Sequence, residues 1–300
     1  MSNKYIILLA SLYGLVIKAL CYLRILWPNG GLNNGVREKN IIISLTSYGR
    51  RVSKTVEYTI ISLLRQTYKP DEIILWLDNV NWNDNNIPLN LKRLTKFGLT
   101  IMFCEDIRSY KKLVPTLKIR KNSLIVTTDD DVFYRRDTIE RLVKQYEENP
   151  QRVYCHYAHG VKFNNDNTIA SYTEWREDVN GTYGPLVFPV GEGCVLYDPD
   201  LLHRDITNEN LFLKLAPIAD DVWFYFMESL NNTECCQLKK KYTIPYWPLD
   251  MFYQHFHKGS SLRDNNVGEN KNDEQIRNIV DHYGIEYDFN NKKFFCTKNS

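Results

Sequence analysis

Three consecutive aspartates, Asp129, Asp130 and Asp131, follow the apolar run Ser123 to Thr127. A short apolar run bounded by turn-forming residues predicts a buried strand, which places the acids at its carboxyl end. Crowded carboxylates repel one another unless a cation lies between them. Mg²⁺ and Mn²⁺ take carboxylate oxygens and bridge to phosphates, and open α/β sheets bind ligands beyond the carboxyl ends of their strands. The triplet therefore predicts a metal and phosphate site, with a solvated acidic turn as the alternative.

A second pair of acids, Asp220 and Asp221, opens the apolar segment Ala219 to Leu230, which is predicted to be a helix. Acids in a first helical turn stabilise the helix dipole, and this structural role fits Asp220. A partly buried carboxylate with a raised pKa can take a proton from a hydroxyl, so Asp221 is the candidate general base and Asp220 the second choice. Trp223 belongs either to the core or to an aromatic face that stacks on a substrate ring.

Basic and polar side chains stand near other predicted strand ends. The loop Thr46 to Arg51, which includes Tyr48, offers backbone donors and guanidinium groups where a nucleotide could lie. Asp78 ends the next strand and could bond a ribose or a base. Lys111 and Lys112 precede the acidic strand and could meet a diphosphate. An ordinary strand–helix turn and a solvated basic helix face are the alternatives.

Four histidines are further candidates. His255 and His257 lie in an aromatic stretch near the C-terminus, where one imidazole could complete the coordination of a metal. His156 and His159 alternate with Tyr157 and could line an acceptor site. For each of these side chains a structural role is the alternative, because a lone histidine is usually part of the packing.

The elements that must position these residues alternate between strands and helices. Predicted strands cover residues 41–45, 70–77, 99–103, 123–127 and 152–157. Predicted helices cover residues 53–66, 89–97, 137–148, 209–214, 219–230 and 272–283, with Ser53 and Asn272 as N-caps of the first and last. This alternation predicts an α/β fold with a largely parallel central sheet flanked by helices. Residues from about 40 to 150 would form a nucleotide-binding half, and residues 151–300 a substrate-binding half that shares the sheet.

Composition narrows the functional class. The 300 residues include 38 basic and 36 acidic side chains, a net charge of +2, so nothing indicates nucleic-acid binding. Seven cysteines are scattered without a CxxC pair, which favours reduced thiols over a zinc site or a disulfide framework.

The N-terminal segment differs from the rest of the chain. Residues 5–27 are apolar except for Lys18 and Arg24, and a Pro-Asn-Gly-Gly turn follows. We expect residues 1–28 to be a signal-anchor helix or an interfacial helix on an anionic leaflet, with residues 29–300 as a single catalytic domain. A buried helix of the globular domain is the alternative. The expected partner is thus a membrane surface.

Several segments together resemble a bacterial glycosyltransferase of the GT-A type, similar to family 2. The segments are Ile41 to Arg51, Leu63 to Thr67 with Lys69 to Leu77, Leu124 to Asp131, Gly191 to Tyr197 and Ala219 to Trp223. Leu124 to Asp131 resembles the DxD strand of that family, and Gly191 to Tyr197 its glycine-rich acceptor-side strand. The chain lacks a QxxRW-type motif, which argues against a processive synthase.

The resemblance implies a GT-A-like fold and transfer of a sugar from a nucleoside diphosphate sugar, with a UDP-sugar favoured, to a hydroxyl of a glycan. It implies Mn²⁺ or Mg²⁺ held by Asp129 and Asp131, and donor contacts from Thr46, Tyr48, Arg51, Asp78, Lys111, Lys112, Asp129 and Asp130. The acceptor side would include Gly193, His156, His159 and Trp223. Asp221 would be the base in an inverting enzyme and would position the sugar in a retaining one.

A lipid-linked acceptor in capsule, O-antigen or exopolysaccharide assembly fits the apolar N-terminus, with the catalytic domain on the cytoplasmic side of a bacterial inner membrane. Two other functions stay open at this stage. One is a sugar-1-phosphate nucleotidyltransferase, although no GxGTR-like loop follows the first strand. The other is a non-catalytic, membrane-tethered glycan-binding protein, against which the intact acids argue.

Overall fold

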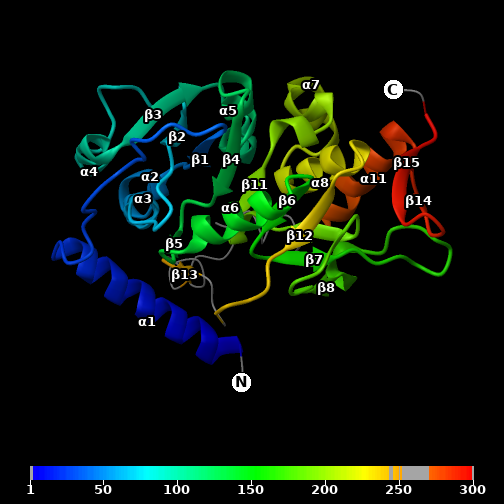
Figure 1. Ribbon diagram of the computed structural model, residues 1–300, viewed down its shortest axis with the longest axis horizontal. Coiled ribbons are helices and arrows are strands. Elements are labelled where there is room, and N and C mark those ends of the chain that lie inside the picture. Colours follow the sequence, from blue (N-terminus) through cyan, green and yellow to red (C-terminus); the bar gives the residue numbers. More distant parts are fainter. Residues whose placement is uncertain (1–2, 243–245, 250, 252–269, 299–300) are drawn as a thin grey trace.

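A twisted eight-stranded sheet forms the centre of the molecule (Figure 1). The computed structural model describes residues 3–242, 246–249, 251 and 270–298. The strands lie in the order β3-β2-β1-β4-β11-β6-β12-β9. Their bounds are β1 Asn40–Thr46, β2 Glu72–Asp78, β3 Leu99–Cys104, β4 Ser123–Thr128, β6 Arg152–Cys155, β9 Tyr183–Gly184, β11 Val195–Tyr197 and β12 Glu234–Gln237.

The first half of the sheet is parallel. Strands β3, β2, β1 and β4 pair in parallel, with Ile43 of β1 between Ile73 of β2 and Val126 of β4. Both faces of β1, β2 and β4 are buried, which explains their continuous apolar runs, whereas β3 at the edge is only partly buried. Because parallel strands end at the same edge, the residues after β1, β2 and β4 meet there.

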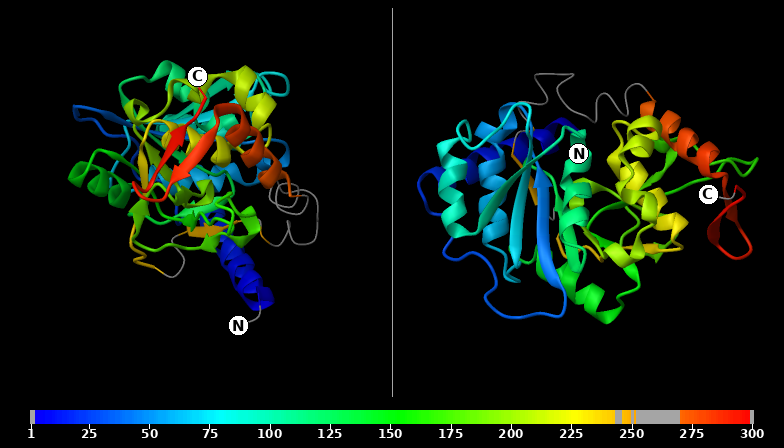
Figure 2. Two further views of the ribbon diagram at one scale, coloured as in Figure 1. Left: turned by 90° about the vertical axis from the view of Figure 1, so that its right-hand side faces the viewer. Right: turned by 90° about the horizontal axis from the view of Figure 1, so that it is seen from above.

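The second half continues the sheet with a change of direction. Strand β11 is antiparallel to both of its neighbours, β4 and β6, while β12 runs parallel to β6 and β9 antiparallel to β12. The two halves therefore share one sheet. The structure confirms the predicted α/β fold with helices on both sides of a mostly parallel sheet (Figure 2).

Successive strand residues feed two apolar cores on opposite faces of the sheet. Leu124 and Val126 belong to one core and Ile125 to the other, as the two-residue period of a strand requires. The helices of the first core are α2 Arg50–Lys54, α3 Val56–Leu64, α4 Leu89–Leu94 and α6 Thr138–Glu148. Those of the second core are α5 Val114–Ile119, α7 Glu209–Leu215, α8 Asp220–Leu230 and α11 Lys271–Tyr283.

Small sheets and 3-10 helices complete the fold. β10 Val187–Pro189 pairs with β7 Ala158–Gly160, and β7 pairs with β8 Arg176–Glu177. β13 Tyr246–Pro248 pairs with β5 Val132–Tyr134, and β14 Ile285–Asp288 with β15 Lys293–Cys296. The 3-10 helices are η1 Thr95–Phe97, η2 Arg108–Lys112, η3 Tyr172–Glu174, η4 Gly191–Gly193, η5 Pro199–Leu201 and η6 Arg204–Thr207.

Two helix starts differ from the prediction. The helix expected over residues 53–66 is two helices, α2 and α3, and Ser53 lies inside α2, where its hydroxyl bonds the carbonyl oxygen of Arg50. Thr55 separates them because its φ of −126° leaves the helical region. The N-cap of α11 is Asn270 rather than Asn272, which is buried within the helix. Serine and asparagine recur near helix starts, so residue type alone does not identify the cap.

The N-terminal helix α1 Asn3–Tyr22 lies beside β13 and projects from the body of the molecule (Figures 1 and 2). Ile17 and Cys21 of α1 join the first core. None of the helices in the described part of the chain, α1 included, has the length and hydropathy needed to cross a bilayer.

Candidate functional site

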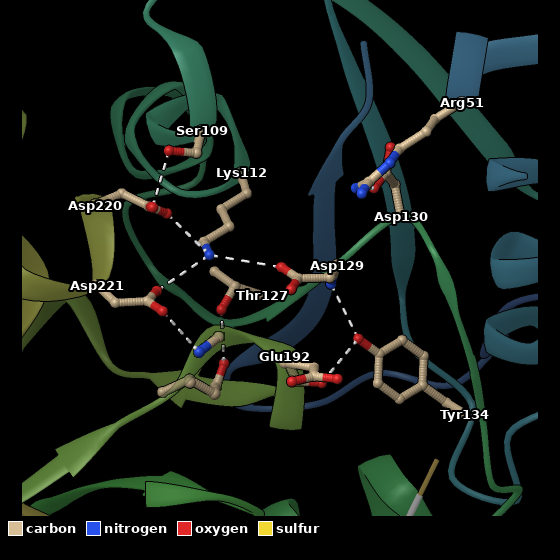
Figure 3. A network of polar contacts seen from close by, with 12 residues as sticks. Arg51, Ser109, Lys112, Thr127, Asp129, Asp130, Tyr134, Glu192, Asp220 and Asp221 are labelled. Atoms are coloured by element: carbon tan, nitrogen blue, oxygen red, sulfur yellow. Dashed lines mark hydrogen bonds and ion pairs between the residues drawn. The ribbon is translucent and has the colours of Figure 1, made fainter. Parts of the chain in front are cut away.

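A buried lysine gathers three acids at the carboxyl end of β4 (Figure 3). Lys112 Nζ, at the end of η2, lies 2.9 Å from Asp220 Oδ2, 3.1 Å from Asp221 Oδ1 and 3.6 Å from Asp129 Oδ1. The four residues come from three segments that are distant in sequence. We call them the Lys112 group.

An arginine on the other side of β4 holds the rest of the acidic triplet. Arg51 Nη1 donates to Asp130 Oδ1 at 2.8 Å, and its Nη2 lies 3.0 Å from Asp131 Oδ2. The hydroxyl of Ser47 donates to the other oxygen of Asp130. These four residues are the Arg51 group, and they tie the loop after β1 to the loop after β4.

A glycine turn closes the site from the second half of the chain. The backbone N–H of Gly191, in η4, donates to Asp221 Oδ2 at 3.0 Å. A Cβ at Gly191 would lie 2.5 Å from Lys112 Nζ and 2.8 Å from Asp221 Oδ1, so a larger residue there would displace these two side chains. The turn thus fixes the orientation of Asp221. In the same site, the backbone N–H of Asp129 donates to the hydroxyl of Tyr134 at 2.9 Å.

Burial dominates the electrostatics of the acids. It raises the pKa of Asp129 to about 7, although Lys112 acts in the opposite direction. Burial likewise raises the pKa of Asp130 to about 6 and that of Asp221 above its usual range. Burial also opposes the charge of Lys112, but the acids around it hold its pKa well above the ordinary value, so the ammonium stays charged. Taken together, the Lys112 group and the Arg51 group contain more carboxylates than cations.

The predicted nucleotide contacts fall into two sets. Arg51, Lys112, Asp129 and Asp130 are in the two groups, and Tyr48 lies beside them with Arg51 over its ring at 5.5 Å. The other set turns to local partners: Thr46 donates to Trp76 O, Asp78 accepts from the backbone and side chain of Asn81, and buried Lys111 pairs with Asp106. Lys111 therefore lies outside both groups.

The structure corrects two predicted acceptor contacts. Trp223 is fully buried in the core, and its indole N–H donates to Ile206 O at 3.2 Å. His156 is also buried, with Nε2 3.0 Å from Thr138 O, and burial lowers its pKa to about 4. Both side chains are therefore packing residues. The prediction was wrong because a helix or strand that is apolar on every side gives no signal of which face meets a ligand.

The remaining acceptor and metal candidates have different outcomes. His159 is half-buried between the rings of Tyr157 and Tyr172, with centroids 5.3 and 5.6 Å away. Gly193 packs against the backbone of Tyr157, where a Cβ would lie 2.7 Å from the nitrogen. His255 and His257 lie outside the described residues.

Metal-ligating side chains are only partly assembled. Across the described residues, no group of three or more acids, histidines or cysteines is placed to hold a metal ion. The surplus of carboxylates nevertheless suits a divalent cation, since Mg²⁺ typically takes one or two carboxylates and completes its shell with phosphate oxygens and water. Asp129 and Asp131, the ligands that the resemblance implies, lie at the end of β4 and pair with Lys112 and Arg51 respectively.

Residue types alone did not identify several side chains of the site. Ser47 and Ser109 each donate to an acid of the site, Asp130 and Asp220 respectively. Glu192 accepts a bond from Tyr134 through its backbone, and its carboxylate lies close enough to act on the pKa of Asp129. The Gly-Glu-Gly sequence of η4 was the available signal for Glu192, whereas single serines carry none.

Comparison with known proteins assigns the family. Residues 42–209, more than half of the chain, match the profile described as Glycosyl transferase family 2. The chain belongs to glycosyltransferase family 2. This match confirms the resemblance and the enzyme class expected from the sequence, and it supports glycosyl transfer from a nucleotide sugar. No curated protein sequence matches the chain.

The solved structures that match the chain are distant in sequence. The family 2 chain is similar to TarS residues 1–349 of S. aureus, at 14% identity and a TM-score of 0.46, covering 82% of this chain and 72% of that one. The structure of TarS with UDP-GlcNAc gives 16% identity and a TM-score of 0.44, covering 70% and 58%. CMP:2-keto-3-deoxy-manno-octonic acid synthetase with CTP gives 11% and 0.41, covering 68% and 90%.

Proposed function

We propose that this family 2 glycosyltransferase moves a sugar from a nucleoside diphosphate sugar, a UDP-sugar in preference, to a hydroxyl of a glycan or lipid-linked glycan in cell-surface polysaccharide synthesis of the capsule or O-antigen kind. The observation that carries the proposal is the Lys112 group. It brings the acid at the end of the donor strand next to two acids of the acceptor half around one buried cation.

Donor binding is proposed at the carboxyl ends of β1 and β4. Asp129 and Asp131 would hold Mn²⁺ or Mg²⁺, which when bound neutralises charge that develops on the leaving diphosphate. Lys112 and Arg51 add fixed positive charge at the same edge of the sheet. Residues 40–150 would thus form the donor half, and residues 151–300 the acceptor half.

Asp221 is proposed as the general base. Its side chain is 28% exposed, compared with 11% for Asp220, so it can reach an acceptor hydroxyl. Asp220 instead accepts from Ser109 Oγ at 2.8 Å and faces Lys112. Lys112 and the Gly191 N–H orient the Asp221 carboxylate. The raised pKa of Asp221 brings it nearer to that of an effective base.

Turnover of a donor panel tests this function. The full chain is incubated with UDP- and GDP-linked sugars, with and without Mn²⁺, and nucleotide release is measured with water or a lipid-linked glycan as acceptor. We expect Asp221→Asn to lower kcat by about 10²- to 10⁴-fold. The matched control is Asp166→Asn, an exposed acid that accepts bonds from the backbone and the hydroxyl of Thr168. Unchanged transfer by Asp221→Asn would show that Asp221 is not the general base. Absence of turnover with every nucleotide sugar tested would overturn the proposed function.

A further inference from the structure

The N-terminal helix α1 is apolar on both of its long faces. Its inner face packs on β13: Tyr13 stacks on Trp247 at 3.9 Å, and Gly14 allows contact with Pro248. Ile17 and Cys21 continue this buried face at the intervals of a helix. The inner face accounts for only part of the apolar surface of α1.

The outer face of α1 is exposed and consists of large apolar side chains. Leu8, Leu9, Leu12, Leu15 and Val16 are between 49% and 62% exposed. Their spacing of one, three or four residues makes a continuous stripe along the helix. A continuous stripe of five large, exposed apolar side chains on a protein surface marks an interaction site for an apolar partner.

A basic cluster lies at the C-terminal end of the same helix. It consists of Arg65, Lys69 and Arg136: Arg136 Nε donates to the carbonyl oxygen of Arg65 at 3.3 Å, and Lys69 Nζ donates to that of Leu64 at 3.0 Å. Arg65 is also close enough to Cys21 of α1 to act on the pKa of its thiol. Burial and the neighbouring guanidinium of Arg136 lower the pKa of Arg65, and burial with both arginines lowers that of Lys69. No carboxylate in the described part of the chain forms an ion pair with these three residues. The nearby Glu140 pairs with Lys144, and Glu57 accepts a bond from Asn90. The cluster therefore repels itself until an anion covers it.

We propose that the outer face of α1 and the basic cluster form one docking surface for an anionic bilayer, with α1 lying in the plane of the interface. The apolar stripe would enter the acyl boundary while the cations meet lipid phosphates, the arrangement of interfacial helices with a basic flank. A second copy of the chain fits the surface less well. Its α1 would bring the same apolar stripe without a single acidic side chain to neutralise the cluster.

The surface lies next to the proposed donor site. Gly14 of α1 contacts the backbone of Pro248 and Leu249, and the N–H of Leu249 donates to the carbonyl oxygen of Asp131 at 2.8 Å. A bilayer bound to the outer face of α1 would thus be separated from the acidic triplet by α1 itself and by the backbone at Leu249. If the proposed function holds, a lipid-linked acceptor would reach the site without leaving the membrane surface.

Vesicle co-sedimentation of the full chain tests the docking surface without any donor or acceptor, so its result is independent of the proposed function. Vesicles of phosphatidylcholine alone are compared with a phosphatidylcholine–phosphatidylglycerol mixture. We expect binding to the mixture that weakens as salt rises from about 0.1 to about 1 M, because the Debye length falls from about 10 to about 3 Å. Leu12→Glu with Val16→Glu should reduce binding roughly tenfold or more. Arg65→Gln and Arg136→Gln should each weaken binding to the mixture about fivefold.

Two controls keep the test decisive. Leu213→Glu and Lys214→Gln make matched changes on exposed positions of α7, which lies at the far end of the molecule from α1 (Figure 1). Thermal melts establish that each variant is folded. Binding that is lost only in the α1 and cluster variants supports the surface. Absence of binding to either vesicle, or a dimer in solution that the α1 variants break while vesicle binding stays unchanged, overturns it.

Discussion

The Lys112 group and the Arg51 group are built on one acidic triplet but lie on opposite faces of the sheet. Lys112 belongs to η2, whose neighbours Tyr110 and Leu113 are in the core beneath α8, whereas Val52 beside Arg51 is in the core beneath α3. Asp129 turns to the first face, and Asp130 and Asp131 turn to the second. Adjacent acids thus serve different walls of the same site.

The two groups also differ in how their charges balance. Lys112 faces three carboxylates, while Arg51 faces two, one of which also accepts from Ser47. The Lys112 group therefore keeps a larger surplus of negative charge, and it includes the candidate base. We infer that the Lys112 group, which includes the candidate base, serves the acceptor side, and that the Arg51 group fixes the loops that carry the triplet and presents Asp131 to the donor.

The largest effect is expected from Lys112→Met. This substitution leaves three acids without their common cation, and breaking a buried ion pair on one side lowers the unfolding free energy by about 3–5 kcal/mol. Urea unfolding at neutral pH measures the loss. Lys214→Met on the exposed surface of α7 serves as the control and should change stability by less than about 0.5 kcal/mol. Equal stability of Lys112→Met and the wild type would contradict the charge balance described for this group.

A smaller effect is expected from Asp130→Asn in the Arg51 group. The asparagine keeps the shape but weakens the bonds from Arg51 and Ser47, so we expect a loss of about 1–3 kcal/mol in unfolding free energy. Asp131 still pairs with Arg51, which limits the loss. The matched control is Asp200→Asn, an acid that is 78% exposed beside Lys39. A loss as large as that of Lys112→Met would remove the distinction between the two groups.

The smallest expected effect is a change of the unfolding free energy with pH. The folded-state pKa of Asp130, about 6, is above the ordinary value of 3.8, so the folded protein holds this proton more tightly than the unfolded chain does. The resulting stability is present below about pH 4 and is lost as pH rises through about 6. The unfolding free energy of the wild type relative to Asp130→Asn should therefore fall, by on the order of 1 kcal/mol, between about pH 4.5 and 7.5. If the difference in unfolding free energy instead rises with pH over this range, the pKa of Asp130 is lowered in the folded protein and the account is contradicted.

Much of this arrangement could be predicted from the sequence. The apolar runs before Asp78 and Asp129 predict strands, and parallel strands bring their carboxyl ends together. Lys112 and Asp129 were both predicted to be near one diphosphate, and Lys112 Nζ lies 3.6 Å from Asp129 Oδ1. These predictions succeed because strand burial and the direction of crossovers are local consequences of residue type.

Other features depend on contacts between distant segments. Nothing in the sequence places β11 between β4 and β6, because strand order is set by tertiary packing. Helix α8 is buried at nearly every position, so its periodicity could not show that Trp223 faces the core. The pairing of Arg51 with Asp130 requires that two loops, 79 residues apart, meet at one edge.

The most direct test of the central claim is calorimetric binding of UDP and GDP to the full chain, with and without Mn²⁺. The account predicts Mn²⁺-dependent binding of one nucleotide, with UDP preferred, that is lost in Asp131→Ala and kept in the exposed control Asp166→Ala. Binding of neither nucleotide by a folded protein, or equal binding by Asp131→Ala, would contradict a donor site built on the acidic triplet.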